Sequence, residues 1–211
     1  KSLNNEITLP FCPESALSGI GNTDFINAVW YKRTVNISPT QAEGRIFLHI
    51  GACDYKTEVW INARSAGTHK GGFASFCFDI TALILPGENI ITICAEDDVR
   101  SPLQPRGKQS ETYASCNCDY TRTTGVWQTV WLEPVAAQHI AQLKTTPDID
   151  KKTVKVEVAT NVCSPDKVEV KVFDGKNLVA KGAALNGVPV ELTMPEDVKL
   201  WTPESPSLYD M

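Results

Sequence analysis

Apolar and polar residues alternate along much of the chain. In residues 45–50 and 57–62, apolar side chains occupy roughly every other position. A period of two is typical of β-strands with two different faces. Turn-forming residues separate these short runs, and only residues 80–85 could form a single helical turn. The pattern predicts an all-β chain that begins with a β-sandwich of the jelly-roll type.

Residues 126–132 differ from the other strands because both of their faces are rather apolar. A strand of this kind is expected in the centre of a sheet or covered on both sides. The tryptophans in strand positions are expected to pack in the core, since a buried aromatic side chain removes a large apolar area from water. A flat platform for stacking sugars is the alternative. These residues are Trp30, Trp60, Trp127 and Trp131.

The pattern changes after Pro134, where aromatic residues become rare and valine dominates. Residues 153–160 and 168–172 alternate almost strictly, and residues 174–177 predict a hairpin turn. We therefore expect two domains, at residues 1–136 and 137–211. The second offers five clear strand candidates, whereas an immunoglobulin-like sandwich has about seven strands. It is thus predicted to be an immunoglobulin-like domain that is incomplete at its C-terminus.

The formal net charge of the 211-residue chain is −5. An acidic chain gives no support to a nucleic-acid or anionic-membrane surface, which needs clustered lysine and arginine. No apolar run approaches the roughly 20 residues of a membrane span. No signal peptide is visible in the first ten residues, so a cytoplasmic or a periplasmic location stays open.

The seven cysteines and three histidines are scattered along the chain. Several cysteines lie in apolar strand patterns, so we interpret them as reduced thiols in the core rather than as a disulfide framework. The histidines lack ligand spacing, which predicts no metal site and no cofactor. Asp97 and Asp98 follow a strand and are expected to be hydrated rather than to bind a cation.

Four segments, taken together and in order, resemble glycoside hydrolase family 2, the family of β-galactosidases, β-glucuronidases and β-mannosidases. Each segment alone is a weak signal, but the ordered set is specific and covers nearly the whole chain. The segments are residues 10–33, 49–81, 104–133 and 200–209.

The resemblance implies a sugar-binding jelly-roll domain, an immunoglobulin-like domain and then a (β/α)8 barrel that holds both catalytic glutamates. A barrel of this type needs about 250 residues, and the chain shows no helix–strand repeat. The expectation is therefore a non-catalytic N-terminal fragment, without catalytic residues, of a retaining β-galactosidase-like enzyme. Its implied partners are a carbohydrate such as a β-galactoside and the barrel of the same polypeptide; assembly into a homo-oligomer stays open.

In this family an acidic residue six positions before the glycine of a Gly-Val-aromatic motif contacts the sugar. With Gly125 as that glycine, the resemblance places Asp119 in this role. Asn27 lies near an asparagine that also touches sugar in some relatives. Arg106 and Arg122 carry guanidinium groups that suit carboxylates, so they could bind Asp119, Glu111 or the barrel. The alternative is that all four residues simply order a solvated loop.

Two other classes of protein remain. A stand-alone carbohydrate-binding module would bind sugar by itself through exposed aromatic residues. A structural or adhesion protein built of β-sandwiches would have no use for Asp119 and Arg122 on one loop, although the composition does not exclude it.

Overall fold

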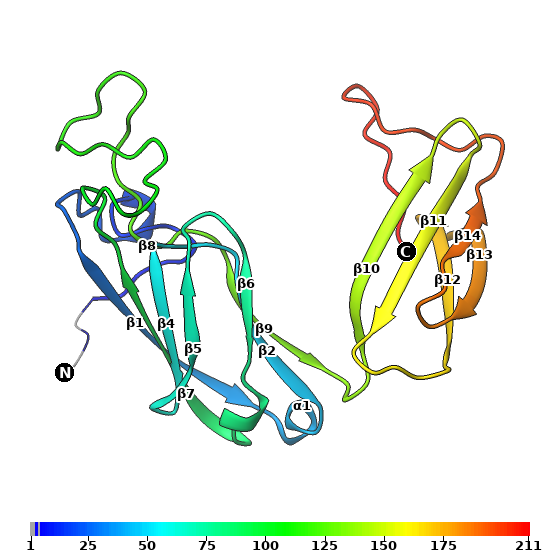
Figure 1. Ribbon diagram of the computed structural model, residues 1–211, viewed down its shortest axis with the longest axis horizontal. Helices are drawn as coiled ribbons and strands as arrows, with labels where there is room; N and C mark the ends of the chain where they lie inside the picture. Colours follow the sequence, from blue (N-terminus) through cyan, green and yellow to red (C-terminus); the bar gives the residue numbers. More distant parts are fainter. Residues whose placement is uncertain (1–2, 4) are drawn as a thin grey trace. The chain divides into compact units, whose positions relative to one another are not determined.

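The computed structural model describes residue 3 and residues 5–211. The chain forms two compact units, Lys1–Ala137 and Gln138–Met211. The regular secondary structure of both is almost entirely β-strand (Figure 1). This confirms the predicted all-β fold class, with a β-sandwich in each unit.

The first unit contains two main antiparallel sheets and one small strand pair. The larger sheet has the strand order β1-β7-β4-β5, and the smaller has the order β6-β2-β9. The pair β3-β8 lies at one end of the sandwich, and the long loop of residues 97–124 leads into β8. The strands are β1 (Ala28–Ile37), β2 (Arg45–Ile50), β3 (Cys53–Asp54), β4 (Lys56–Ile61), β5 (Arg64–Lys70), β6 (Phe76–Asp79), β7 (Gly87–Glu96), β8 (Gly125–Val126) and β9 (Val130–Val135).

Among the described residues of this unit, the helical segments are single turns. The α1 turn (Pro39–Ala42) begins with a capping box, in which Ser38 Oγ accepts from the Gln41 amide and Gln41 Oε1 accepts from the Ser38 amide. This pairing satisfies two backbone donors that a helix start leaves without partners. The other two turns are η1 (Ala16–Ser18) and η2 (Thr81–Leu83), and η2 falls within the predicted turn at residues 80–85.

The core of the first unit lies between its two sheets. Ile46, Leu48 and Ile50 point inward from β2, and Val59 and Ile61 point inward from β4; all five are at most 1% exposed. They alternate with half-buried or exposed neighbours, as the period of two requires. Burying one such side chain contributes about 1.5–3 kcal/mol relative to leaving it exposed.

The expectation of a central strand at residues 126–132 is wrong. The stretch breaks after Val126, and β9 begins only at Val130, at the edge of the smaller sheet. The Gly51 amide donates to the Thr129 carbonyl. In an antiparallel pair every second residue bonds to the neighbouring strand. The backbone groups of Val130, Leu132 and Pro134 therefore point away from β2. A proline has no amide hydrogen to donate, which suits this outward position on an edge strand.

The expected core packing of the tryptophans is also wrong for two of them. Trp30 is 52% exposed and Trp131 is 47% exposed. Trp30 alternates with buried Tyr31 and therefore lies on the outer face of its sheet, where its ring stacks on Trp60 at 5.4 Å. Trp131 stacks on the imidazole of His49 at 4.2 Å. These pairs bury one ring face without entering the core.

The cysteines are free, but most of them are not core residues. Cys53 and Cys94 are buried, and burial raises the pKa of both thiols. Cys12 is half-buried. The other four are exposed, which contradicts the expected core position; they are Cys77, Cys116, Cys118 and Cys163.

The second unit pairs a three-stranded sheet, β10-β11-β14, with the hairpin β12-β13. Valines pack between them, with Val156 fully buried. Asp174 pairs with Asn177 across a two-residue turn with Gly175 at φ +60°, which confirms the predicted hairpin. Near the end of the chain, Asp210 exchanges two backbone hydrogen bonds with Phe173 of β12. The strands are β10 (Ile140–Asp148), β11 (Thr153–Thr160), β12 (Lys167–Asp174), β13 (Asn177–Leu185) and β14 (Val190–Thr193).

Candidate functional site: the loop between β7 and β8

Residues 97–124 form a long loop that leaves the end of β7 and returns to β8 (Figure 1). The two arms of the loop pair with each other: the Tyr120 amide donates to the Lys108 carbonyl at 2.7 Å, and the Ser110 amide donates to the Tyr120 carbonyl at 2.8 Å. The tip is closed by reciprocal hydrogen bonds between Cys116 and Asp119. The loop is therefore held by its own backbone bonds.

Two glutamine side chains fasten the loop to buried carboxylates at strand ends. Gln109 Nε2 donates to Asp54 Oδ2 at 2.7 Å, and Gln109 Oε1 accepts from the Thr123 amide. In the same way, Gln104 Nε2 donates to Asp97 Oδ1. Asp54 is 1% exposed and Asp97 is 5% exposed. The Gln109 amide thus links the loop to the end of β3, and the Gln104 amide holds it to its own first residue, which directly follows β7.

The pKa values of Asp54 and Asp97 are both raised above the usual value of an aspartate. Burial raises the pKa of Asp54 to about 7, and the nearby carboxylate of Asp97 adds to the rise. Burial also raises the pKa of Asp97. The expectation that Asp97 is hydrated is therefore wrong, because the residue lies under the loop rather than at the surface, whereas Asp98 is exposed.

Asp119 lies on the return arm of the loop and is partly accessible, with 30% of its side chain exposed. Its Oδ2 lies 3.4 Å from Nη1 of Arg106. Arg106 also places its Nε 3.4 Å from Glu111 Oε1 and donates to the Gln109 carbonyl. Arg106 therefore pairs with both acids named from the sequence, and it leaves part of the Asp119 carboxylate open to a ligand.

Arg122 has a different role from Arg106. It is 2% exposed, and its guanidinium donates to the carbonyls of Thr112 and Thr23. Its Cζ lies 4.2 Å from the centre of the Phe25 ring. These contacts fit the alternative in which the arginine orders neighbouring backbone. Arg122 ties the loop to the segment that precedes β1.

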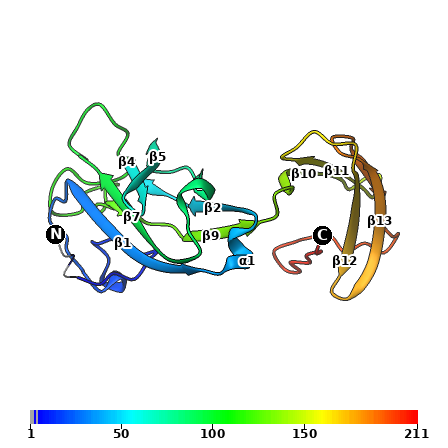
Figure 2. The same ribbon diagram turned by 90° about the horizontal axis from the view of Figure 1, so that it is seen from below.

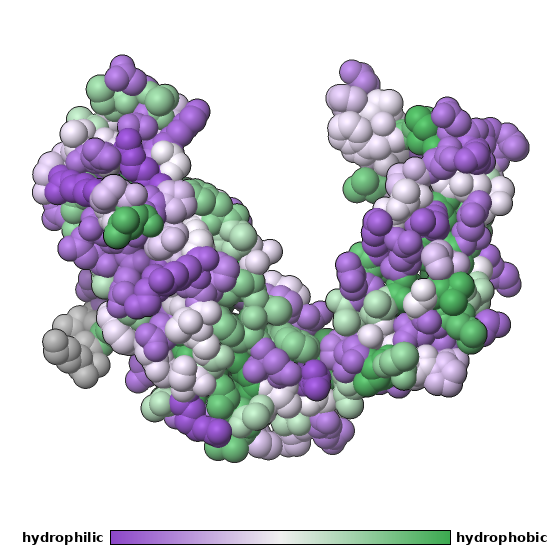
Figure 3. Space-filling model, in the orientation of Figure 1, coloured by the Kyte–Doolittle hydropathy of each residue, from purple (hydrophilic) through white to green (hydrophobic). Residues whose placement is uncertain are grey.

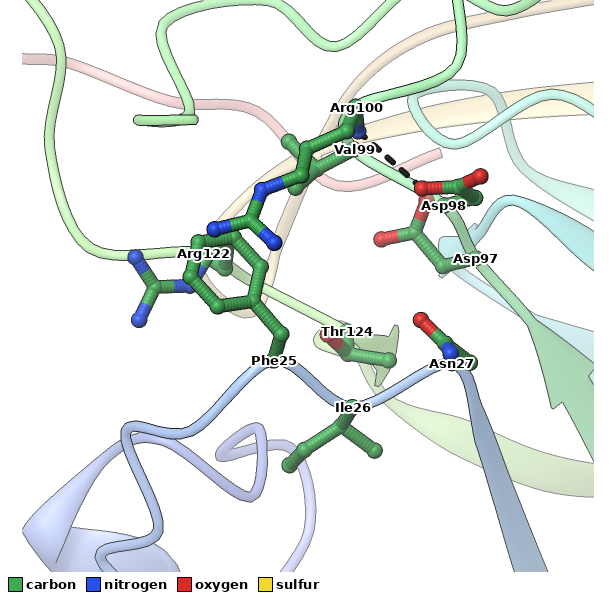
Figure 4. Close-up of a pocket in the computed structure, with 9 residues that line it drawn as sticks. All are labelled: Phe25, Ile26, Asn27, Asp97, Asp98, Val99, Arg100, Arg122 and Thr124. Atoms are coloured by element: carbon green, nitrogen blue, oxygen red, sulfur yellow. Dashed lines mark hydrogen bonds between the residues drawn. The ribbon is translucent and has the colours of Figure 1, made fainter. Parts of the chain in front are cut away.

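Asn27 and Arg122 line a small cavity of about 230 Å³ beside the loop (Figure 4). The Asp97 carboxylate and the Asn27 amide point into this space, and Phe25 with the Arg100 guanidinium above it closes the opposite side. Asp98 and Thr124 add polar groups to the wall, and Val99 adds an apolar one. Carboxylate, amide and guanidinium groups together provide donors and acceptors for a polyhydroxylated ligand.

The structure thus groups the four predicted residues in two pairs. Asp119 and Arg106 are in contact, while Asn27 and Arg122 share the cavity, whose lining includes neither Asp119 nor Arg106. Sequence reasoning missed the residues that hold the loop. Glu14 was also missed: its carboxylate accepts from the Thr124 amide at 3.2 Å. The glutamines near the predicted loop were the available signal, but Asp54, the partner of Gln109, lies 55 positions away in the sequence.

Within residue 3 and residues 5–211, no group of three or more histidine, cysteine, aspartate or glutamate side chains is arranged to hold a metal ion. The same part of the chain contains no helix long and apolar enough to cross a membrane.

Comparison with known proteins identifies the family. Residues 18–134 match the model described as "Glycosyl hydrolases family 2, sugar binding domain", and residues 138–211 match the model described as "Glycosyl hydrolases family 2". The first match covers more than half of the chain. The chain belongs to glycoside hydrolase family 2.

The relatives are glycosidases of much greater length. The chain is 28% identical over 202 residues to a β-glucuronidase of Paenibacillus borealis, a match that covers 89% of the chain and 33% of the relative. It is 21% identical over 200 residues to a β-galactosidase of Thermoanaerobacter pseudethanolicus, a match that covers 89% of the chain and 26% of that relative. A solved β-glucuronidase of an uncultured Clostridium species shares the fold, with a TM-score of 0.71 and 21% identity, covering 95% of this chain and 35% of that one. The chain therefore spans about a quarter to a third of the length of these relatives.

Proposed function

We propose that this chain is the N-terminal, non-catalytic part of a retaining β-glycosidase, and that its loop 97–124 binds the sugar at the active site of the full-length enzyme. In a retaining glycosidase two carboxyl groups about 5–5.5 Å apart act as acid/base and nucleophile. Both belong to the barrel that the family resemblance implies. The contribution of this chain is then to binding and orientation rather than to bond cleavage.

The position of Asp119 is the observation that carries the proposal. The carboxylate is partly exposed and lies 3.4 Å from Arg106. Its loop is held by the bonds of Gln104 and Gln109 to buried carboxylates. An ionised carboxylate accepts hydrogen bonds from two adjacent hydroxyl groups, which is a common arrangement on a pyranose ring. A loop that is ordered before binding loses less conformational entropy when the ligand arrives.

The substrate class is a β-linked glycoside with either a neutral galactosyl or an acidic glucuronyl group. The sequence favoured the galactoside, whereas the relatives carry both the β-glucuronidase and the β-galactosidase name. Asp119 suits the hydroxyl groups that both sugars share. The carboxylate of a glucuronyl group would be repelled by Asp119 and must therefore lie away from it. We accordingly assign the discrimination between the two sugars to the rest of the enzyme.

The test is the Asp119→Ala substitution in the full-length enzyme, assayed with aryl β-galactoside and aryl β-glucuronide. Hydrogen bonds to a charged group contribute about 1.5–3 kcal/mol each. Loss of two such bonds corresponds to a fall in kcat/KM of at least about 100-fold. The matched control is Asp197→Ala, which removes an exposed carboxylate from the second unit.

Unchanged kcat/KM in the Asp119→Ala enzyme, with normal thermal unfolding, would remove this residue from the sugar site. Asp119→Asn provides a graded comparison, because the amide keeps one acceptor but loses the charge. A smaller loss for Asn than for Ala is expected.

A further inference from the structure

Phe25 lies in the segment that leads into β1, and its ring is held between two arginines of loop 97–124. The Cζ atom of Arg100 lies 3.5 Å from the ring centre, and the Cζ atom of Arg122 lies 4.2 Å from it (Figure 4). Two planar guanidinium groups at these distances would overlap on one ring face, so they occupy opposite faces. Arg100 belongs to the outgoing arm of the loop and Arg122 to the return arm. Figure 2 shows the start of β1, in blue, at the same end of the sandwich as this loop, in green.

The ring stabilises a buried charge on Arg122. This guanidinium donates to the carbonyls of Thr23 and Thr112, but its Nε is buried and has no hydrogen-bond partner. Within the part of the chain that the structure describes, neither Arg100 nor Arg122 forms an ion pair. The face of an aromatic ring is partly negative and attracts a cation, most strongly where water is excluded. The face of Phe25 supplies that attraction to both arginines.

Phe25 belongs to the contact with the loop rather than to the hydrophobic core. It is half-buried, and it is not among the described residues that form the core of the first unit or pack against it. A third ring contact also comes from the loop: Tyr113 meets Phe25 edge-on, with ring centres 5.0 Å apart. The ring therefore joins the loop to the segment before β1.

Both arginines also bind the middle of the loop. Arg100 Nε donates to the Glu111 carbonyl at 3.1 Å. Arg122 Nη1 donates to the Thr112 carbonyl at 2.6 Å. The two guanidinium groups that enclose the Phe25 ring thus hold the backbone of two consecutive loop residues.

Glu111 connects this held backbone to Asp119. Its carboxylate lies 3.4 Å from Nε of Arg106, whose Nη1 lies 3.4 Å from Asp119 Oδ2. From these contacts we infer that Phe25 is a positioning residue for sugar binding, because its ring holds both arms of the loop and thereby the Asp119 carboxylate. The inference rests on the proposed role of Asp119, and its test separates the two.

The test replaces Phe25 by mono-, di- and trifluorinated phenylalanine, in the 211-residue chain and in the full-length enzyme. Fluorine withdraws electron density from the ring face and changes its shape little, so it weakens a cation–π contact but preserves apolar packing. In the 211-residue chain, amide hydrogen exchange of Ser110 and Tyr120 should become faster with each fluorine. In the enzyme, KM for the aryl β-glycoside that the wild type cleaves should rise with each fluorine, by about fivefold in total, while kcat changes less than about twofold.

Two natural substitutions and one control accompany this series. Phe25→Tyr keeps the ring face, so exchange and KM should stay near those of the wild type. Phe25→Leu removes the face and should match or exceed the effect of the trifluorinated ring. The control is the same fluorinated series at Phe11, an exposed residue of the same segment; within the described residues no cation lies over its ring. Thermal unfolding checks that each variant is folded.

The inference is overturned if KM stays constant across the fluorinated series at Phe25, if the series at Phe11 gives an equal rise, or if Phe25→Tyr loses as much as Phe25→Leu. Asp119→Ala is measured in parallel with the same substrate. A large loss in Asp119→Ala beside a constant KM in the Phe25 series removes the role of Phe25 alone. Unchanged kinetics in both removes the proposed role of Asp119 as well.

Discussion

Nη1 of Arg106 lies 3.4 Å from Oδ2 of Asp119, and both side chains remain about one-third exposed. At this distance and exposure the pair adds little to stability, since exposed ion pairs contribute about 0–1 kcal/mol. Its effect is on orientation. Arg106 also contacts Glu111 and the Gln109 carbonyl, so its guanidinium is held in place and orients the Asp119 carboxylate.

Arg106 is therefore expected to act as a positioning residue in the full-length enzyme. Arg106→Ala should raise KM by about tenfold, because Asp119 loses its orientation, while the thermal midpoint changes little. Arg106→Lys should restore part of the loss, since it keeps the charge without the planar fork. Steady-state kinetics of both variants would check this. A KM equal to that of the wild type in Arg106→Ala would show that Asp119 needs no such partner.

The isolated 211-residue chain is expected to bind simple sugars weakly or not at all. Asp119 contributes a few hydrogen bonds, and the surrounding pocket in the full-length enzyme is assigned to the barrel. Titration calorimetry with galactose, glucuronate, mannose and β-linked disaccharides should give no saturable heat at millimolar concentration. Saturable binding would favour a stand-alone carbohydrate-binding module instead.

Gly125 is expected to tolerate no side chain. Its φ is +75°, and a Cβ placed there would lie 2.4 Å from Oη of Tyr31, which accepts from the Val126 amide. Gly125→Ala should reduce the free energy of unfolding of the first unit by more than about 2 kcal/mol. Gly19→Ala is the matched control: it has φ +85° but open space around the Cβ, so about 1 kcal/mol is expected. Denaturant titrations followed by tryptophan fluorescence compare the two; an equal effect would rule out the contact with Tyr31.

The stability of the first unit is expected to fall as pH rises from about 4 to 7. The pKa of Asp54 is about 7 in the folded chain, against about 3.9 in an unfolded one. The folded state therefore binds more protons than the unfolded state across this window, which makes the slope of unfolding free energy with pH negative. Asp54→Asn should flatten this slope, whereas Asp197→Asn at the surface should not. Denaturation at pH 5, 6, 7 and 8 provides the measurement, and identical slopes in both variants would contradict it.

The sequence predicted what depends on local pattern. Alternation located most strands, and Asp174 to Asn177 located a hairpin turn. Alternation could not decide which face of an apolar strand is buried, so Trp30 was wrongly assigned to the core. The anchors of the loop were also out of reach. Gln109 bonds to a carboxylate 55 positions away, and such contacts depend on how the sheets assemble rather than on spacing.

The surface of the second unit illustrates the same limit. Figure 3 shows polar and apolar residues mixed over its visible face. Leu143, Leu178 and Leu185 lie in strands but are about half exposed. Their hydropathy alone predicts burial, and the arrangement of the sheets determines the outcome.

The bond from Arg122 to the Thr23 carbonyl joins two segments that are 99 positions apart in the sequence. One of them leads to Asn27 and the other carries Asp119, so a shift in either backbone is transmitted to the other through one buried side chain. Engineers who exchange binding loops among members of this family would therefore need to transplant residues 22–27 together with residues 97–124, as a single cassette.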